Sequence, residues 1–97
     1  MKETIFYILL NIRTVKGFES FGKFIIGNNR EAAAAIFSQL RGNPDVDEKT
    51  ILTIDLVETI NDLPLNIEMI TCTLEELAVN CKIITKETFK YLNLEQG

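Results

Sequence analysis

Histidine is absent from this 97-residue chain, and cysteine occurs only twice. Without histidine, acid-base catalysis near neutral pH would depend on carboxyl, lysine or tyrosine groups with shifted pKa values. Two cysteines nine positions apart, Cys72 and Cys81, cannot complete a four-ligand zinc site within one chain. We therefore predict no catalytic residues, no metal ligands and no cofactor, and we expect that the protein is not an enzyme.

The same two cysteines are too few to form a disulfide framework, and the chain has no Asn-x-Ser/Thr acceptor for a glycan. We expect a cytoplasmic protein with both cysteines buried as small apolar residues. Cys72 directly precedes a predicted helix start, where the helix dipole can lower a thiol pKa. A catalytic thiol would still need a base, and no histidine can supply one.

Nucleotide-binding loops and long apolar runs are also missing. Gly22 and Gly27 lead into no Gly-Lys-Ser/Thr motif, and the apolar stretch that begins at Thr4 is too short to cross a membrane. A net charge of -4, from 14 acidic and 10 basic side chains, disfavours nucleic acids and anionic membranes as partners. Three acidic residues of one loop lack the EF-hand pattern and are expected to be solvated: Asp45, Asp47 and Glu48.

Strand patterns dominate what is present. Thr4 to Arg13 predicts a strand that is apolar on both faces, which is typical of a strand inside a sheet. A turn at Gly17 then leads to a second strand from Phe18 to Ile26, in which Gly22 indicates a bulge. A second hairpin is predicted from two further strands and the turn between them: Thr50 to Ile60, Asn61 to Pro64, and Leu65 to Cys72.

Each predicted hairpin is followed by a helical pattern. Asn28 or Asn29 can cap a helix that runs to about Leu40 and ends before Gly42 and Pro44, with a buried stripe of Ala33, Ile36, Phe37 and Leu40. Thr73 and Glu76 form a capping box for a later helix. The run Ile83-Ile84-Thr85 leaves two alternatives, one bent helix or a second short helix capped by Thr85 that buries Phe89 and Leu92.

Together these patterns predict a single domain over residues 1–97 with an α+β fold. The simplest arrangement is a ββαββα two-layer sandwich, in which a four-stranded, mainly antiparallel sheet carries the helices on one face. The order of the strands cannot be read from the sequence.

The sheet face away from the helices is the candidate functional surface. Strand alternation groups apolar side chains in its middle, Tyr7, Leu9, Phe21 and Val57, with polar ones at its edges, Asn11, Arg13, Lys23, Thr53 and Asp55. Apolar surface left in water is costly, so we expect a partner there. The leading hypothesis is a non-enzymatic interaction domain that forms a homodimer through this face. The alternative is a regulatory or carrier domain that holds a small molecule or a protein partner, with Arg13 or Lys23 as its anion anchor.

A third hypothesis concerns residues 73–92, which resemble a helix-turn-helix DNA reader through the Leu77-Ala78 pair and the Thr85 cap. The resemblance covers about a fifth of the chain and implies phosphate contacts from Lys86 and Lys90. The segment departs from the motif at Lys82, which stands where glycine is usual in the turn, and in its spacing to Phe89, which is one residue too long. No third helix directly precedes it in the sequence.

Overall fold

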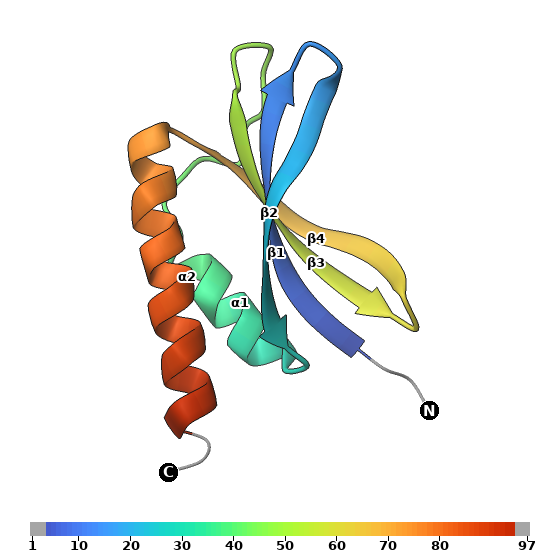
Figure 1. Ribbon diagram of the computed structural model, residues 1–97, viewed down its shortest axis with the longest axis vertical. Helices are drawn as coiled ribbons and strands as arrows, with labels where there is room; N and C mark the ends of the chain where they lie inside the picture. Colours follow the sequence, from blue (N-terminus) through green and yellow to red (C-terminus); the bar gives the residue numbers. More distant parts are fainter. Residues whose placement is uncertain (1–3, 95–97) are drawn as a thin grey trace.

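Two β-hairpins, each followed by one helix, make up the computed structural model, which describes residues 4–94 (Figure 1). The predicted ββαββα order is confirmed. The elements are β1 (Thr4–Thr14), β2 (Gly17–Gly27), α1 (Arg30–Ser38), β3 (Leu52–Ile60), β4 (Leu63–Cys72) and α2 (Leu74–Leu94).

The four strands form one antiparallel sheet in the order β2-β1-β3-β4, so β1 and β3 lie in its interior. The prediction of an interior first strand is confirmed. Ile8 of β1 stands opposite Leu56 of β3, and Leu10 stands opposite Ile54, which places their side chains on the face that the helices cover. This face carries the core, because both helices pack on the same side of the sheet (Figure 1).

The second hairpin has a tighter turn than the sequence suggested. Asn61 and Asp62 alone connect β3 to β4, and both have positive φ angles of 52° and 69°, as a two-residue hairpin turn requires. The predicted four-residue turn is therefore too long, because Leu63 and Pro64 already belong to β4. Proline is tolerated there because β4 is an edge strand.

Helix α1 is capped as predicted at its start but ends earlier. The Asn29 side chain accepts a hydrogen bond from the Ala32 N–H at 2.9 Å, and Ala33, Ile36 and Phe37 are buried. The helix ends at Ser38 with Gln39 as its C-cap, so Gly42 is not the helix stop that the sequence suggested. Gly42 instead allows the chain to approach β4, as described below.

Helix α2 is continuous from Leu74 to Leu94, so the alternative of a second short helix is wrong. The predicted capping box is present: Glu76 Oε1 accepts from the Thr73 N–H at 2.9 Å, and Thr73 Oγ1 accepts from the Glu76 N–H at 3.1 Å. The β-branched residue Ile84 is fully buried, and this burial offsets its lower helix propensity. Phe89 is exposed, against the prediction, and the predicted burial of the Leu92 side chain lies outside what the structure describes.

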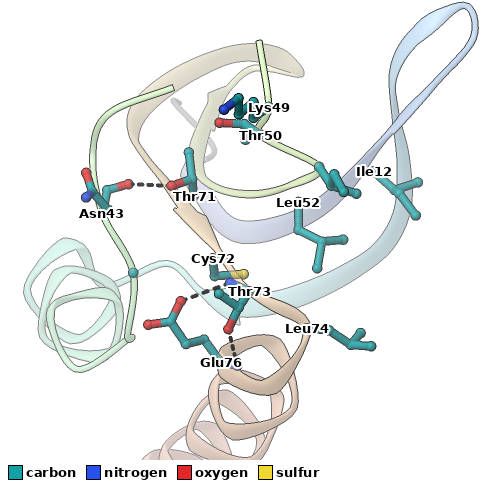
Figure 2. Close-up of a pocket in the computed structure, with 12 residues that line it drawn as sticks. Ile12, Asn43, Lys49, Thr50, Leu52, Thr71, Cys72, Thr73, Leu74 and Glu76 are labelled. Carbon is teal, nitrogen blue, oxygen red and sulfur yellow. Dashed lines mark hydrogen bonds between the residues drawn. The ribbon is translucent and has the colours of Figure 1, made fainter. Parts of the chain in front are cut away.

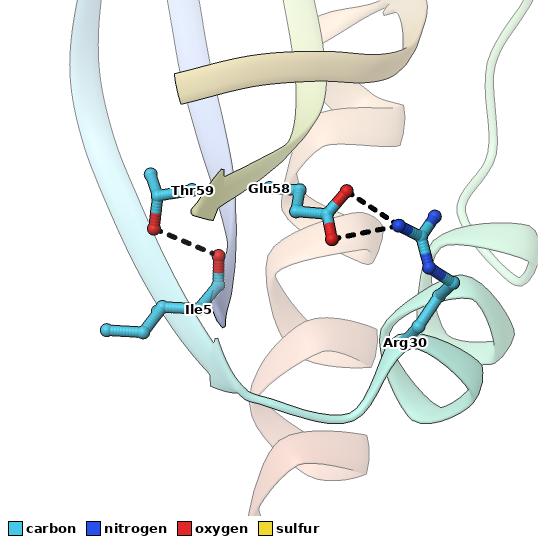
Figure 3. A network of polar contacts seen from close by, with 4 residues as sticks. All are labelled: Ile5, Arg30, Glu58 and Thr59. Atoms are coloured by element: carbon cyan, nitrogen blue, oxygen red, sulfur yellow. Dashed lines mark hydrogen bonds and ion pairs between the residues drawn. The ribbon is translucent and has the colours of Figure 1, made fainter. Parts of the chain in front are cut away.

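An ion pair between an exposed arginine and a buried glutamate joins α1 to the sheet on the helix-covered side (Figure 3). Arg30 Nη2 donates to both carboxylate oxygens of Glu58, at 2.7 and 2.8 Å. The Glu58 side chain is buried, while the Arg30 side chain stays largely exposed. The neighbouring residue Thr59 points to the opposite side, where its hydroxyl donates to the Ile5 carbonyl at 3.3 Å (Figure 3).

Candidate functional site

No helix or loop among residues 4–94 covers the sheet face opposite α1 and α2 (Figure 1). Strand pairing decides which residues share this face: Tyr7 stands opposite Val57 and Ile25, and Leu9 stands opposite Asp55 and Lys23. Because side chains alternate along a strand, the rest of the set follows from the register. The open face consists of Ile5, Tyr7, Leu9, Asn11, Arg13, Phe18, Ser20, Phe21, Lys23, Ile25, Thr53, Asp55, Val57, Thr59, Pro64, Asn66, Met69 and Thr71.

Phe21 reaches the open face because β2 contains a bulge. The register shifts between Leu10, which pairs with Gly22, and Asn11, which pairs with Ser20, so Phe21 has no partner in β1. A Cβ at Gly22 would contact Leu10 on the helix-covered side. Alternation along the strand therefore directs Phe21 to the open face, beside Lys23.

Tyr7 and Lys23 form a contact on this face: Lys23 Nζ lies 4.3 Å from the centroid of the Tyr7 ring. A cation over an aromatic ring at such a distance contributes about 0.5–1 kcal/mol to the stability of the fold when the site is exposed. Leu9 and Tyr7 are partly buried, and Val57 is only 1% exposed. Val57 therefore lies on the open face as expected but offers almost no surface to a partner.

The middle of the open face is partly polar, whereas the sequence suggested an apolar middle with polar residues only at the edges. Asn11 Nδ2 donates to Thr53 Oγ1 at 3.1 Å and to Asp55 Oδ2 at 3.0 Å, and Ser20 Oγ donates to Asn11 Oδ1 at 2.6 Å. The other oxygen of the Asp55 carboxyl, Oδ1, is buried and has no hydrogen-bond partner among the described residues. Burial raises the pKa of Asp55, and the nearby side-chain amides of Asn11 and Asn66 oppose this rise.

Arg13, the second predicted anion anchor beside Lys23, is used to hold a loop. Its Nε donates to the Thr50 carbonyl at 2.6 Å and its Nη2 to the Asp47 carbonyl at 3.0 Å. Its guanidinium carbon also lies 4.6 Å from the centroid of the Phe18 ring. These contacts direct much of the hydrogen-bonding capacity of Arg13 to the protein itself.

Within the open face, large apolar side chains are exposed mainly at its outer parts. Five of them are between 40% and 63% exposed: Ile5, Phe18, Phe21, Ile25 and Met69. Of these five, the sequence placed only Phe21 on this face and missed Ile5, Phe18, Ile25 and Met69. Ile25 has the same parity as Phe21 and Lys23 and could have been found, whereas Met69 could be placed only once the pairing of β4 with β3 was known.

Both edges of the sheet carry features that hinder pairing with another strand. β2 has register shifts near Gly22 and again near Gly27, and β4 has one beside Val57 and a proline at position 64. At its C-terminal end, β4 is paired on its outer side through a bridge between Thr71 and Asn43. The open face is thus a more accessible contact surface than either edge.

The surroundings of both cysteines disfavour the thiolate form. Burial raises the pKa of Cys72 to about 11, and the nearby Glu76 and Cys81 add to this rise. The predicted lowering by the helix dipole is therefore outweighed, since burial and a nearby carboxylate both disfavour the charged thiolate. Burial also raises the pKa of Cys81.

Within residues 4–94, no three His, Cys, Asp or Glu side chains come together as a metal site would require. None of the described helices combines the length and apolar character needed to cross a membrane.

No protein-family model, curated protein or solved structure matches this chain.

Proposed function

We propose that this chain is a self-associating interaction domain whose copies pair through the open face of the sheet. The observation that carries this proposal is the group of five large apolar side chains, 40% to 63% exposed, on a face that no described element covers. Removing such surface from water is favourable by about 25 cal/mol per Å². A partner on this face would recover that free energy.

The amount of apolar surface matches the need of a homodimer. At the about 150–250 Å² that is typical of an aromatic side chain, five that are half exposed present at most roughly 375–625 Å² in each chain. A standard interface buries about 800 Å² per partner, of which about 65% is apolar in homodimers, or roughly 500 Å². A second copy of the chain would therefore use most of the exposed apolar surface of the open face.

Charge also favours a second copy on this face. The whole chain carries a net charge of -4, so two copies repel each other on average. Three acidic strand residues, Glu19, Glu58 and Glu68, are paired with residues whose side chains lie on the helix-covered side. The strand residues of the open face include two cations, Arg13 and Lys23, and one acid, Asp55. Repulsion between two copies is therefore smallest when they meet through this face.

The two other functions suggested by the sequence find less support. A hollow of 290 Å³ on the open face, lined in part by Tyr7, Lys23 and Ile25, is at the small end of ligand pockets, and its cation already contacts the Tyr7 ring. DNA binding through residues 73–92 would need a turn between two helices, but α2 runs through this region without one.

The test is the mass in solution, measured by light scattering after size-exclusion chromatography at about 10 and 100 μM. The 11.0 kDa chain is expected to elute with twice its own mass. Ile25→Lys, at a 63% exposed position of the open face, is expected to give the monomer mass. Leu65→Lys is the matched control, because Leu65 is 60% exposed, lies on the other edge strand and pairs with Glu58 on the helix-covered side.

A monomer mass for the unmodified chain at both concentrations would refute the proposal. Dissociation by Leu65→Lys but not by Ile25→Lys would refute the open face as the interface and assign the contact to the β4 edge.

A further inference from the structure

The helices leave one end of the core-bearing side of the sheet uncovered. α1 ends at Ser38 and α2 begins at Leu74, so the sheet beyond them is bordered only by the loop that joins α1 to β3. A pocket of about 880 Å³ lies there (Figure 2). This volume falls within the range of about 300–1,000 Å³ that is usual for small-molecule sites.

The pocket is built from four parts of the chain and is mainly apolar. The apolar lining comes from β1, from the junction of the loop with β3, from the end of β4 and from the start of α2. Its residues, in that order, are Ile12, Ile51 with Leu52, Cys72 and Leu74. Ile51 and Leu74 are strongly exposed, at 60% and 74%. An apolar molecule in the pocket would take this surface out of water.

Hydrogen bonds hold the loop in place at one end of the pocket. Asn80, which is fully buried in α2, accepts from the Arg41 N–H at 2.7 Å and donates to the Arg41 carbonyl at 2.8 Å. The backbones of Asn43 and Thr71 exchange two hydrogen bonds of 2.9 and 2.7 Å. A glycine is required at position 42, between Arg41 and Asn43, because a Cβ there would collide with the Thr71 carbonyl oxygen.

The other end of the loop is held by β1. Arg13 donates side-chain hydrogen bonds to the Thr50 and Asp47 carbonyls, and its backbone N–H donates to Ile51 at 2.8 Å. The loop is therefore anchored at both ends and does not collapse onto the apolar side chains below it. A pocket whose border is held by the protein itself costs a ligand little ordering entropy.

The charged residues of the lining differ in what they already bind. The Glu76 carboxylate accepts from the Thr73 N–H in the capping box (Figure 2). No hydrogen bond or ion pair engages the Lys49 ammonium within residues 4–94, and Lys49 is exposed at the border of the pocket. The lining thus combines an apolar floor with one available cation.

We propose that this pocket binds a small amphipathic carboxylic acid, with its alkyl chain against Ile12, Leu52 and Leu74 and its carboxylate at Lys49. The site is independent of the proposed self-association, because Ile12, Leu52 and Cys72 point to the side of the sheet opposite the open face. It adds ligand binding to an interaction domain.

The test is a pair of probes of equal chain length, octanoate and 1-octanol, titrated into the isotope-labelled protein and followed by NMR. Octanoate is expected to bind saturably and to shift the methyl signals of Ile12, Ile51 and Leu74, while those of Ile25 and Met69 stay in place. Leu74→Gln is expected to lower the affinity for both probes about tenfold. Leu63→Gln is the matched control, because Leu63 is 73% exposed and lies outside the pocket.

The head group is tested separately by Lys49→Met. This variant is expected to weaken the binding of octanoate about three- to fivefold, which is the contribution of an exposed ion pair, and to leave the affinity for 1-octanol unchanged. Lys82→Met, an exposed lysine outside the pocket lining, serves as the control.

An equal effect of Lys49→Met on both probes would overturn the carboxylate assignment. Shifts confined to the open face, or no saturable binding, would overturn the pocket as a ligand site. These outcomes are separate from the proposed function, because Ile25→Lys is expected to abolish the dimer and to leave octanoate binding intact.

Discussion

Asn80 and Arg41 are joined by two hydrogen bonds across a separation of 39 residues, in which the Asn80 amide both accepts from and donates to the Arg41 backbone. Asn80 is fully buried, so its amide would be costly without these partners. The pair connects the second turn of α2 to the loop that follows α1. It fixes where the loop leaves the helical layer and thus where the pocket begins.

Replacing Asn80 by alanine is expected to destabilise the fold by about 1–3 kcal/mol, because the Arg41 N–H and carbonyl lose their partners. Urea unfolding monitored by circular dichroism measures this change. Lys82→Ala, at an exposed position of the same helix, should change the free energy of unfolding by less than about 0.5 kcal/mol. Equal stabilities of Asn80→Ala and the unmodified chain would contradict a structural role for the pair.

Gly42→Ala is expected to destabilise by about 1–3 kcal/mol, because the new Cβ would meet the rigid backbone oxygen of Thr71. Gly22→Ala provides the comparison. Its Cβ would come within 3.1 Å of the end of the Leu10 side chain, which can move aside, so a smaller loss is expected. Thermal unfolding of both variants measures the difference, and a larger loss for Gly22→Ala would show that the loop yields more easily than the core.

Arg30→Met is expected to lower the free energy of unfolding by about 1–2 kcal/mol, because the buried Glu58 carboxylate loses its charged partner. The cost is reduced because Arg30 is largely exposed and water can replace part of its interaction. A double-mutant cycle with Glu58→Gln measures the coupling directly. A coupling energy near zero would mean that the ion pair seen in Figure 3 does not contribute to stability.

Asp55→Asn is expected to make the protein more stable at neutral pH. Burial raises the pKa of Asp55 above its ordinary value of 3.8, so the folded chain binds a proton more tightly than the unfolded chain. The unmodified chain then loses stability as pH rises from about 3.8 through the raised pKa of Asp55. The Asp55→Asn variant has no carboxyl group to ionise there, so it does not lose this stability. It also keeps an oxygen that can accept the hydrogen bond from Asn11.

The measurement is thermal unfolding of both proteins between pH 3 and pH 8. The advantage of Asp55→Asn should be full at pH 7 and should vanish below pH 3.8, where both states of the unmodified chain are protonated. An advantage that stays constant over this range would show that the effect does not come from the ionisation of Asp55.

Local sequence patterns were sufficient for most of the elements. The apolar residues on both sides of β1 predicted its interior place, and Asn29 and the Thr73–Glu76 box marked two helix starts correctly. These features depend on residues close together in the chain. The errors, such as the end of α1, the four-residue turn before β4 and a possible break in α2, concern boundaries that contacts with distant residues decide.

The candidate surfaces show the same division. Alternation along β1 was enough to group Tyr7 with Leu9, and alternation along β3 was enough to group Asp55 with Val57, because the period of a strand depends only on its own backbone. The sequence could not show that Val57 is covered, that Asn11 bonds Asp55, or that Met69 joins the face. These facts depend on the strand order and on the register between strands that are distant in the chain.

The sequence by itself therefore determined the kinds of element, their order and the two faces of the central strands, since hydrophobic periodicity and capping act locally. Only the tertiary structure decided the order β2-β1-β3-β4, the partly polar middle of the open face and the pocket beside Lys49. The physical reason is that each of these depends on which distant segments exclude water from one another and satisfy each other's hydrogen bonds.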